Sequence, residues 1–368
     1  MTPRQIMFNA IARKPVDRFP FSTYNCHPFA WGAHLNAPGY TPILDKIAAT
    51  SVGCLSKVYA RPVSEPSPVE SLQRVEGTDT YTTFTYHTPL GPLTRVTRKP
   101  ADQPGMCVKH YLTEPGDVER YLSIPYVPAK WDVSTAVAHA QDLGEKGAAY
   151  LLYADPFNDV AELFDQGEFA IRTLTQFDFI RSLVEFRFER MFNDLKLLLE
   201  ALAPFRTPFL FGTGGPERAT PPLLSPDVFR RLVVPYQSRL VELVHDFGYP
   251  VSLHCHGRVR EVFPYILECG FDVVEPLEPP PQGNIDLKGL RQAAGKNISL
   301  MGYIQDQEFY LLTESEMRSR VREIAALIGQ DTGYICCPTA TPFQHPPTAV
   351  FVANYLAFLD EAEAVGRS

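Results

Sequence analysis

The sequence lacks a long hydrophobic run. No apolar stretch reaches the roughly 18 to 20 uninterrupted residues that a membrane-spanning helix requires. The first twenty residues, MTPRQIMFNAIARKPVDRFP, also lack the charged and then apolar pattern of a signal peptide. The sequence therefore predicts a cytoplasmic protein that does not enter the membrane.

Clustered positive charge is absent as well. The 368 residues include 34 Lys and Arg against 42 Asp and Glu, and the formal net charge is −8 at pH 7. Nucleic-acid binding needs a basic face that neutralises phosphate groups. Because neither the overall balance nor any run of Lys and Arg supplies one, nucleic acid is not an expected partner.

Two kinds of short motif are missing. The seven cysteines are odd in number and show no CxxC spacing, so a reducing compartment fits better than a disulfide framework. No GxGxxG follows the first predicted strand, and GxxxxGK[ST] does not occur. A nucleotide-binding doubly wound sheet loses its main support by this absence.

Short apolar runs alternate with helical patterns through most of the chain. This alternation predicts an α/β fold, a (β/α)8 TIM barrel forming a single domain over 1–368, with the doubly wound sheet as the alternative. The eight predicted strands are 18–23, 53–59, 148–153, 208–211, 251–254, 271–274, 298–302 and 333–336.

Helix signals and one irregular region complete the prediction. Capping residues predict helices over 228–247 and 258–269, and Thr313 with Glu316 predicts a capping box that opens another helix. The turn-rich region 61–109, in the N-terminal third, shows period-two stretches and predicts an antiparallel hairpin inserted into the barrel.

Active sites of such barrels lie at the carboxyl ends of the strands. The most informative strand end reads Val-Ser-Leu-His254-Cys255-His256-Gly257. Residues two apart on a strand point to the same side, so His254 and His256 form a candidate metal-binding pair. The alternative is two ordinary hydrogen-bonded histidines.

Glu275 and Glu278 follow the next predicted strand, 21 and 24 residues after His254. Two His and one carboxylate suit zinc or another divalent metal and leave a position open for substrate. We take Glu278 as the third ligand and Glu275 as a catalytic group beside the metal. The opposite assignment, and plain loop salt bridges, stay open.

Other strand ends supply further candidates. Asp155 is a candidate acid or base, although an Asp before Pro also forms turns. The candidate substrate-binding residues, each with a structural alternative, are Tyr24, Asn25, His27, Glu217, Arg218 and Gln305.

At these residues the sequence resembles the uroporphyrinogen decarboxylase superfamily, and within it the zinc-dependent methyltransferase branch. Segments that carry the resemblance occur in family order over nearly the whole chain. They are Arg13-Lys-Pro-Val-Asp-Arg18-Phe-Pro20, Thr88-Pro-Leu-Gly-Pro-Leu93, Leu224-Ser-Pro-Asp-Val-Phe229, Ser252-Leu-His-Cys-His-Gly257 and Gly302-Tyr-Ile-Gln305.

The resemblance implies a barrel that holds zinc and transfers a methyl group to or from a corrinoid carried by a partner protein. A folate is the alternative methyl partner. It also implies a homodimer, since homodimers are common in the family.

The sequence departs from the family in three places. Phe21-Ser-Thr-Tyr-Asn-Cys-His27 stands where the decarboxylases carry an arginine-rich motif, which disfavours porphyrinogen decarboxylation. His256 and Ala340 stand where the methyltransferases have cysteine. Fewer thiolates make a bound metal a stronger electrophile, which favours substrates with a small O-methyl group over thiols.

The sequence thus leaves three functions open. The first is a metal-dependent methyltransferase acting on a small O-methyl substrate. The second is a metal-assisted decarboxylase or lyase on a small or aromatic acid, and the third is a ligand-binding barrel without catalysis.

Overall fold

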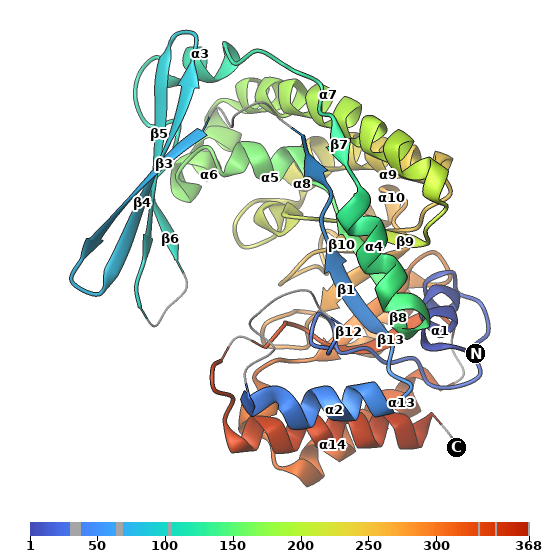
Figure 1. Ribbon diagram of the computed structural model, residues 1–368. Coiled ribbons are helices and arrows are strands. Elements are labelled where there is room, and N and C mark those ends of the chain that lie inside the picture. Colours follow the sequence, from blue (N-terminus) through green and yellow to red (C-terminus); the bar gives the residue numbers. More distant parts are fainter. Residues whose placement is uncertain (30–37, 64–68, 102–104, 330–331, 343, 367–368) are drawn as a thin grey trace. The chain divides into compact units, whose positions relative to one another are not determined.

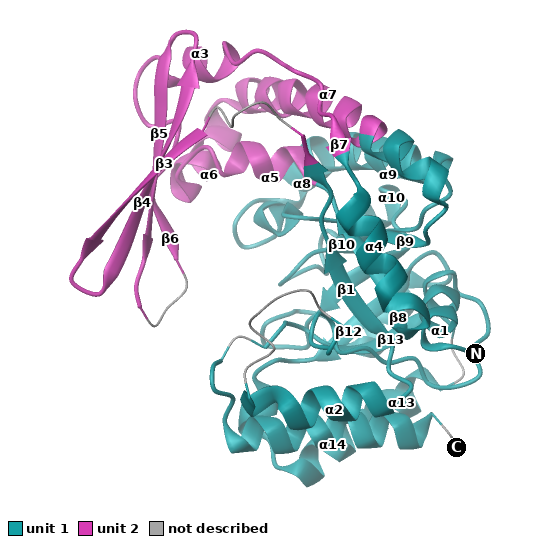
Figure 2. Ribbon diagram, in the orientation of Figure 1, with its two compact units in different colours: residues 1–61, 132–153, 198–368 teal, residues 62–131, 154–197 magenta. Residues whose placement is uncertain are grey.

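The computed structural model describes residues 1–29, 38–63, 69–101, 105–329, 332–342 and 344–366. The chain forms two compact units (Figure 2). Unit 1 contains residues 1–61, 132–153 and 198–368, and unit 2 contains residues 62–131 and 154–197.

Unit 1 is built on a parallel sheet of seven strands in the order β1-β8-β9-β10-β11-β12-β13 (Figure 1). Each strand lies within or overlaps a run predicted from the sequence. The strands are β1 (Cys54–Val58), β8 (Gly147–Leu152), β9 (Phe209–Gly214), β10 (Val251–His254), β11 (Val273–Leu277), β12 (Ser299–Ile304) and β13 (Tyr334–Pro338).

A short segment joins the two outer strands of this sheet. Phe21 forms a parallel bridge with Cys336 of β13, and Ser22 forms one with Gly53 beside β1. The first predicted strand, 18–23, is thereby reduced to two bridging residues, because Pro20 has no N–H to donate. The sheet thus curls as in a TIM barrel, and the predicted α/β barrel-like fold is confirmed.

Apolar side chains explain why these segments form buried strands. β11, β12 and β13 are buried at every position, as expected for parallel strands covered on both faces. Inside the ring a hydrophobic cluster includes Tyr24, Tyr150, Leu210 and Cys337.

Helices of unit 1 follow the strands. α2 and α14, from opposite ends of the chain, pack against each other (Figure 1). The helices are α1 (Pro3–Ile11), α2 (Thr41–Ala49), α4 (Ser134–Leu143), α8 (Pro226–Leu232), α9 (Val234–Asp246), α10 (Phe263–Glu268), α11 (Leu287–Ala294), α12 (Glu308–Leu311), α13 (Glu314–Ile328) and α14 (Ala349–Val365).

Two predicted helices differ from the structure. The helix predicted over 228–247 is divided into α8 and α9 at Val233, because Pro235 cannot donate the backbone hydrogen bond that would continue α8. The helix predicted over 258–269 is shorter and begins at Phe263. The capping box of Thr313 and Glu316 is present at the start of α13.

Unit 2 contains a four-stranded antiparallel sheet in the order β3-β4-β5-β6. It occupies most of the region 61–109 in which the sequence predicts a hairpin. Its elements are β3 (Val69–Glu76), β4 (Asp79–Thr88), β5 (Gly91–Lys99), β6 (Met106–Lys109), α3 (Asp117–Leu122), α5 (Pro156–Ala161), α6 (Gln166–Thr175) and the first part of α7 (Phe177–Leu202). Two further short strands, β2 (Arg61–Pro62) and β7 (Trp131–Asp132), pair with each other.

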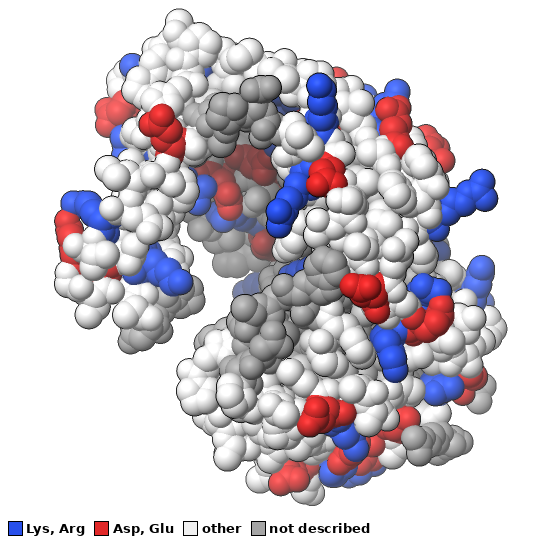
Figure 3. Space-filling model, in the orientation of Figure 1, with Lys and Arg blue, Asp and Glu red and all other residues white. Residues whose placement is uncertain are grey.

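Charges of both signs are interspersed on the face drawn in Figure 3. Around α13 and α14, for example, Arg318 lies 3.1 Å from Asp360, and Arg322 lies 2.9 Å from Glu361. Among the described residues, no helix is long and apolar enough to cross a membrane.

Candidate functional site

The carboxyl ends of β10 and β11 bring the central pair of the site together. His254 is the last residue of β10, and the parallel register places it directly opposite Glu275 of β11. His254 Nδ1 lies 3.0 Å from Glu275 Oε2 and 3.1 Å from Oε1. The two side chains therefore form a carboxylate–histidine pair whose geometry is set by the sheet.

Two tyrosines hold this pair in place. The Tyr150 hydroxyl donates to Glu275 Oε1 at 2.8 Å, and the Tyr24 hydroxyl lies 3.1 Å from His254 Nδ1. Glu275 is only 1% exposed. A buried carboxylate is stable only when charged or hydrogen-bonding groups surround it, and His254 and Tyr150 meet that need.

The electrostatics favour a charged pair. Burial opposes ionisation of Glu275, but His254, Tyr150 and Lys57 together outweigh it and lower the pKa of this carboxyl. Burial likewise opposes a proton on His254, yet the Glu275 carboxylate outweighs it and raises the pKa of His254. His254 therefore keeps its proton to a higher pH than an ordinary histidine.

The backbone of Tyr24 is strained. This residue has φ +54, in the left-handed region that bulky side chains rarely adopt. Such strain persists where surrounding contacts enforce it, often at functional sites. Here the strained backbone accompanies a Tyr24 side chain that is only 3% exposed and reaches His254.

Lys57, near the end of β1, adds a partly buried cation to the site. Its Nζ lies 4.8 Å from the centre of the Tyr24 ring. Burial lowers the pKa of Lys57, while the Glu275 charge opposes that effect. A lysine in this setting can bind an anionic substrate group or exchange a proton.

His256 and Glu278 form a second pair. His256 Nδ1 lies 3.4 Å from Glu278 Oε1, and Glu278 Oε2 accepts the Gly257 N–H at 2.6 Å. Gln305 Nε2 donates to Glu278 Oε1 at 3.4 Å. Burial opposes the charge on Glu278, but the hydrogen bonds from His256, Gly257 and Gln305 outweigh it and lower its pKa.

The two imidazole rings lie in edge-to-face contact. Their centroids lie 4.7 Å apart with an interplanar angle of 81°. Both carboxylate contacts are made through Nδ1. Among the described residues, neither Nε2 atom has a recorded hydrogen-bond partner.

The histidine pairs fit part of a metal site. Metal-binding histidines usually direct the second ring nitrogen at a carboxylate, and both rings do so here. A third ligand is not in place: within the described ranges, no group of three or more His, Cys, Asp and Glu side chains is arranged to hold an ion. The ligand set His254, His256 and Glu278 therefore stays a prediction, and Glu278 contacts His256 as Glu275 contacts His254.

The remaining candidates lie at several places. Asn25 accepts the Lys57 N–H at 3.1 Å, beside the site. His27 is only 1% exposed, and burial lowers its pKa to about 4. Glu217 and Arg218 lie in a 3-10 turn after β9, where Glu217 accepts the Gly215 N–H.

Asp155 belongs to unit 2. Its carboxylate accepts the Asn158 N–H at 2.5 Å and caps α5. This is the turn-forming alternative that the sequence left open for an Asp before Pro. A catalytic role for Asp155 stays a prediction.

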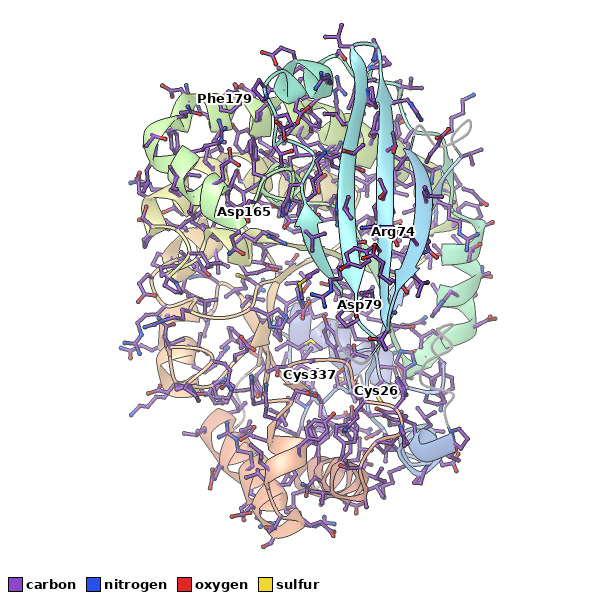
Figure 4. All side chains as sticks on the ribbon, turned by 90° about the vertical axis from the view of Figure 1, so that its left-hand side faces the viewer. Cys26, Arg74, Asp79, Asp165, Phe179 and Cys337 are labelled. Atoms are coloured by element: carbon purple, nitrogen blue, oxygen red, sulfur yellow. The ribbon has the colours of Figure 1, made fainter. Side chains whose placement is uncertain are left out.

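Sequence reasoning missed Tyr150 and Lys57. Both lie inside apolar strands, where a single polar residue resembles ordinary core or strand-end packing. Their position along the strand could have indicated them, because each lies in the carboxyl-terminal half of its strand. The neighbouring Cys337 (Figure 4) is buried in the barrel interior.

Comparisons with known proteins agree with this architecture. Residues 215–353 match the family described as uroporphyrinogen decarboxylase (URO-D). A methyltransferase from Methanosarcina mazei shares the fold, with a TM-score of 0.60, 13% identity, and coverage of 99% of this chain and 99% of that chain.

A second solved structure is more distant. A B12-independent methionine synthase from Shewanella sp. W3-18-1 has a TM-score of 0.43 and 15% identity, and covers 66% of this chain and 69% of that chain. No curated protein matches the sequence. Over residues 215–353, which include both histidine pairs, the family match agrees with the resemblance to the uroporphyrinogen decarboxylase superfamily stated from the motifs.

Proposed function

From a barrel whose residues 215–353 match the uroporphyrinogen decarboxylase family, we propose an enzyme of the methyltransferase type. It moves a methyl group from a small O-methyl substrate to a corrinoid carried by a partner protein, or to a folate. One observation carries the proposal: the buried Glu275 lies 3.0 Å from His254 Nδ1, and His254 Nε2 has no hydrogen-bond partner among the described residues. The Glu275 carboxylate also raises the pKa of His254.

This pair supplies what O-demethylation requires. When the C–O bond of a methyl ether breaks, its electron pair stays on oxygen and the methyl group goes to the acceptor nucleophile. The leaving oxygen must then be protonated, and a positioned general acid contributes a rate factor of about 10² to 10⁴. His254 would donate this proton from Nε2, while Glu275 stabilises the imidazolium through Nδ1.

Lys57 and Tyr24 fit supporting roles in this reaction. Lys57 places a positive charge near the developing negative charge on oxygen, where it stabilises the transition state. Tyr24 fixes the His254 ring from the side of Nδ1. In the alternative with a divalent metal, Nε2 of His254 and of His256 would hold the ion in place of that proton, and the ion would supply Lewis acidity at the same oxygen.

A direct assay tests the proposal. Anisole and methoxybenzoates with a ¹³C-labelled methyl group serve as donors, and cob(I)alamin or tetrahydrofolate serves as acceptor. We expect labelled methyl on an acceptor with the wild-type protein, and a loss of about 10² to 10⁴ in rate for His254→Ala.

His87→Ala is the matched control, because His87 is 56% exposed on β4. Its rate should equal that of the wild type. Equal rates for His254→Ala and the wild type would contradict the proposed role. Metal analysis of the purified protein gives the second arm: bound zinc that disappears in the double variant His254→Ala/His256→Ala supports the metal prediction.

Decarboxylation is the second candidate, supported by the description of the matched family. Loss of carbon dioxide leaves a carbanion that needs a proton, which His254 could supply. Release of carbon dioxide from hydroxybenzoates without any methyl acceptor would favour this reaction over methyl transfer.

A further inference from the structure

Unit 2 contains a cavity of about 410 Å³. Its walls come from β3, β4 and β5 of the antiparallel sheet and from α3, α5 and α7. Small-molecule sites commonly enclose about 300 to 1,000 Å³. The cavity is therefore large enough for a compact organic ligand, and every residue that lines it belongs to this one unit.

Two of its three arginines are held by neighbouring residues of unit 2. Arg187 Nε lies 2.7 Å from Asp159 Oδ2. Arg190 donates from Nη2 to the Ile124 carbonyl at 2.8 Å, and its guanidinium lies 3.9 Å from the centre of the Phe186 ring. These contacts orient both guanidinium groups without engaging all their donors.

The third arginine, Arg95 on β5, is less well satisfied. Its Nε is buried and has no hydrogen-bond partner among the described residues. Its guanidinium lies 5.9 Å from the centre of the Phe84 ring, at the outer limit of a cation–π contact. A buried donor without a partner is costly to the protein, and an anion in the cavity would satisfy it.

The charges around the cavity are unequal. Three arginines face two carboxylates, Asp159 and Glu162, which leaves one positive charge. Burial lowers the pKa of Arg190, as expected where no anion fully compensates a guanidinium charge. The cavity is therefore suited to a ligand with a single negative charge.

The rest of the lining is aromatic and apolar. Burial raises the pKa of Tyr86, Tyr111 and Tyr121, so all three remain neutral phenols that can donate hydrogen bonds. Leu93 and Leu163 also line the cavity. Such walls pack well against the flat faces of an aromatic ring.

We propose that this cavity binds a small aromatic carboxylate, with the carboxylate at Arg95 and Arg190 and the ring between the tyrosines and leucines. A phosphate dianion fits less well, because only one positive charge is uncompensated. None of the residues that line the cavity is among the barrel residues that carry the proposed function, so the proposal does not depend on them.

Isothermal titration calorimetry of the full-length protein, with benzoate as the ligand, tests the site. We expect a Kd of about 0.1 to 5 mM, which suits a ligand of this size. Benzamide has the same shape without the charge, so it should bind at least about tenfold more weakly. Inorganic phosphate should also bind more weakly than benzoate.

Arg95→Gln should weaken benzoate binding by about tenfold or more. Arg74→Gln is the matched control, since Arg74 lies on β3 of the same sheet (Figure 4) but does not line the cavity. His254→Ala should bind benzoate as the wild type does, which separates this cavity from the barrel site. Circular dichroism spectra of all variants, including Arg190→Lys, show whether weaker binding is caused by unfolding.

Three results would overturn the proposal. The first is no benzoate binding by the wild type at up to about 20 mM, a concentration well above the Kd expected for a ligand of this size. The second is benzamide or phosphate binding as tightly as benzoate. The third is a folded Arg95→Gln variant with unchanged affinity for benzoate.

Discussion

Single side chains set the chemistry of the barrel site. Glu275 contributes through His254 and not by itself, since its carboxylate lies against Nδ1 of that ring and against the Tyr150 hydroxyl. The sequence predicts the two histidines and two glutamates, but not which glutamate contacts which histidine. The pairing follows from the parallel register of β10 and β11, which places His254 opposite Glu275.

Glu275→Gln tests this relation by its pH dependence. The raised pKa of His254 means that the general acid is present up to a pH above 6.5 and is lost as pH rises through the folded value. Without the carboxylate the pKa of His254 should fall, and burial should push it down further.

We therefore expect kcat for methyl transfer to fall by about 10- to 100-fold in Glu275→Gln, with its alkaline limb moved to lower pH. Glu70→Gln, on exposed β3, is the control and should keep the wild-type profile. An unchanged alkaline limb in Glu275→Gln would show that Glu275 does not control the proton on His254.

Strands position the site through close packing. Gly212 of β9 lies directly beside Tyr150 of β8, so that a Cβ at this position would lie 2.0 Å from the Tyr150 ring. Only glycine leaves room for the Tyr150 side chain that donates to Glu275. This close approach to Tyr150 cannot be predicted from the sequence, in which Gly212 is simply a glycine at the end of a predicted strand.

Gly212→Ala should lower the free energy of unfolding by about 1 to 3 kcal/mol because the added methyl overpacks the barrel. Denaturant titration measures this loss. Gly105→Ala is the control, because its nearest non-neighbouring atom would lie 3.5 Å away. If Gly212→Ala is as stable as Gly105→Ala, Tyr150 can move, and its contact with Glu275 is not fixed by packing.

Elements that the sequence predicts well are those with strong periodic patterns. All seven strands of the parallel sheet are predicted, because their apolar runs are bounded by glycine, proline or polar residues. The sequence predicts less about the α8–α9 boundary, where Pro235 outweighs a continuous helical period. It also predicts only a hairpin over 61–109, where β3 is largely polar and exposed and β6 has only four residues.

At the scale of the whole molecule, stability should depend on pH through a few buried groups. Asp306 is only 8% exposed, and burial raises its pKa to about 6. A carboxyl with a raised folded pKa contributes stability that is fully present below its unfolded value of 3.8 and is lost as pH rises through about 6. The charged form is then buried at an energetic cost.

Asp306→Asn removes this cost. Relative to the wild type, the variant should gain up to about 1 to 3 kcal/mol in unfolding free energy between pH 4 and pH 7. Urea titrations at several pH values measure the difference.

Asp17→Asn is the opposite control. Its hydrogen bonds from Arg18 and the N-terminus, aided by their charges, outweigh burial and lower the pKa of Asp17 to about 2. Its contribution is lost only as pH falls from about 3.8 towards 2, so it changes little between pH 4 and pH 7. A pH-independent difference between Asp306→Asn and the wild type would contradict the burial argument.

The homodimer implied by the family resemblance stays a prediction.

The central claim is that Glu275 keeps a proton on His254 and directs Nε2 at the reacting group. Nitrogen-15 NMR titration of the imidazoles measures it most directly, with His254→Gln used to assign the His254 resonances. The account predicts that His254 titrates above pH 6.5, holds its proton on Nδ1 when neutral, and titrates at a lower pH in Glu275→Gln. A His254 that titrates below pH 6.5 in the wild type, or that carries its neutral proton on Nε2, would contradict it.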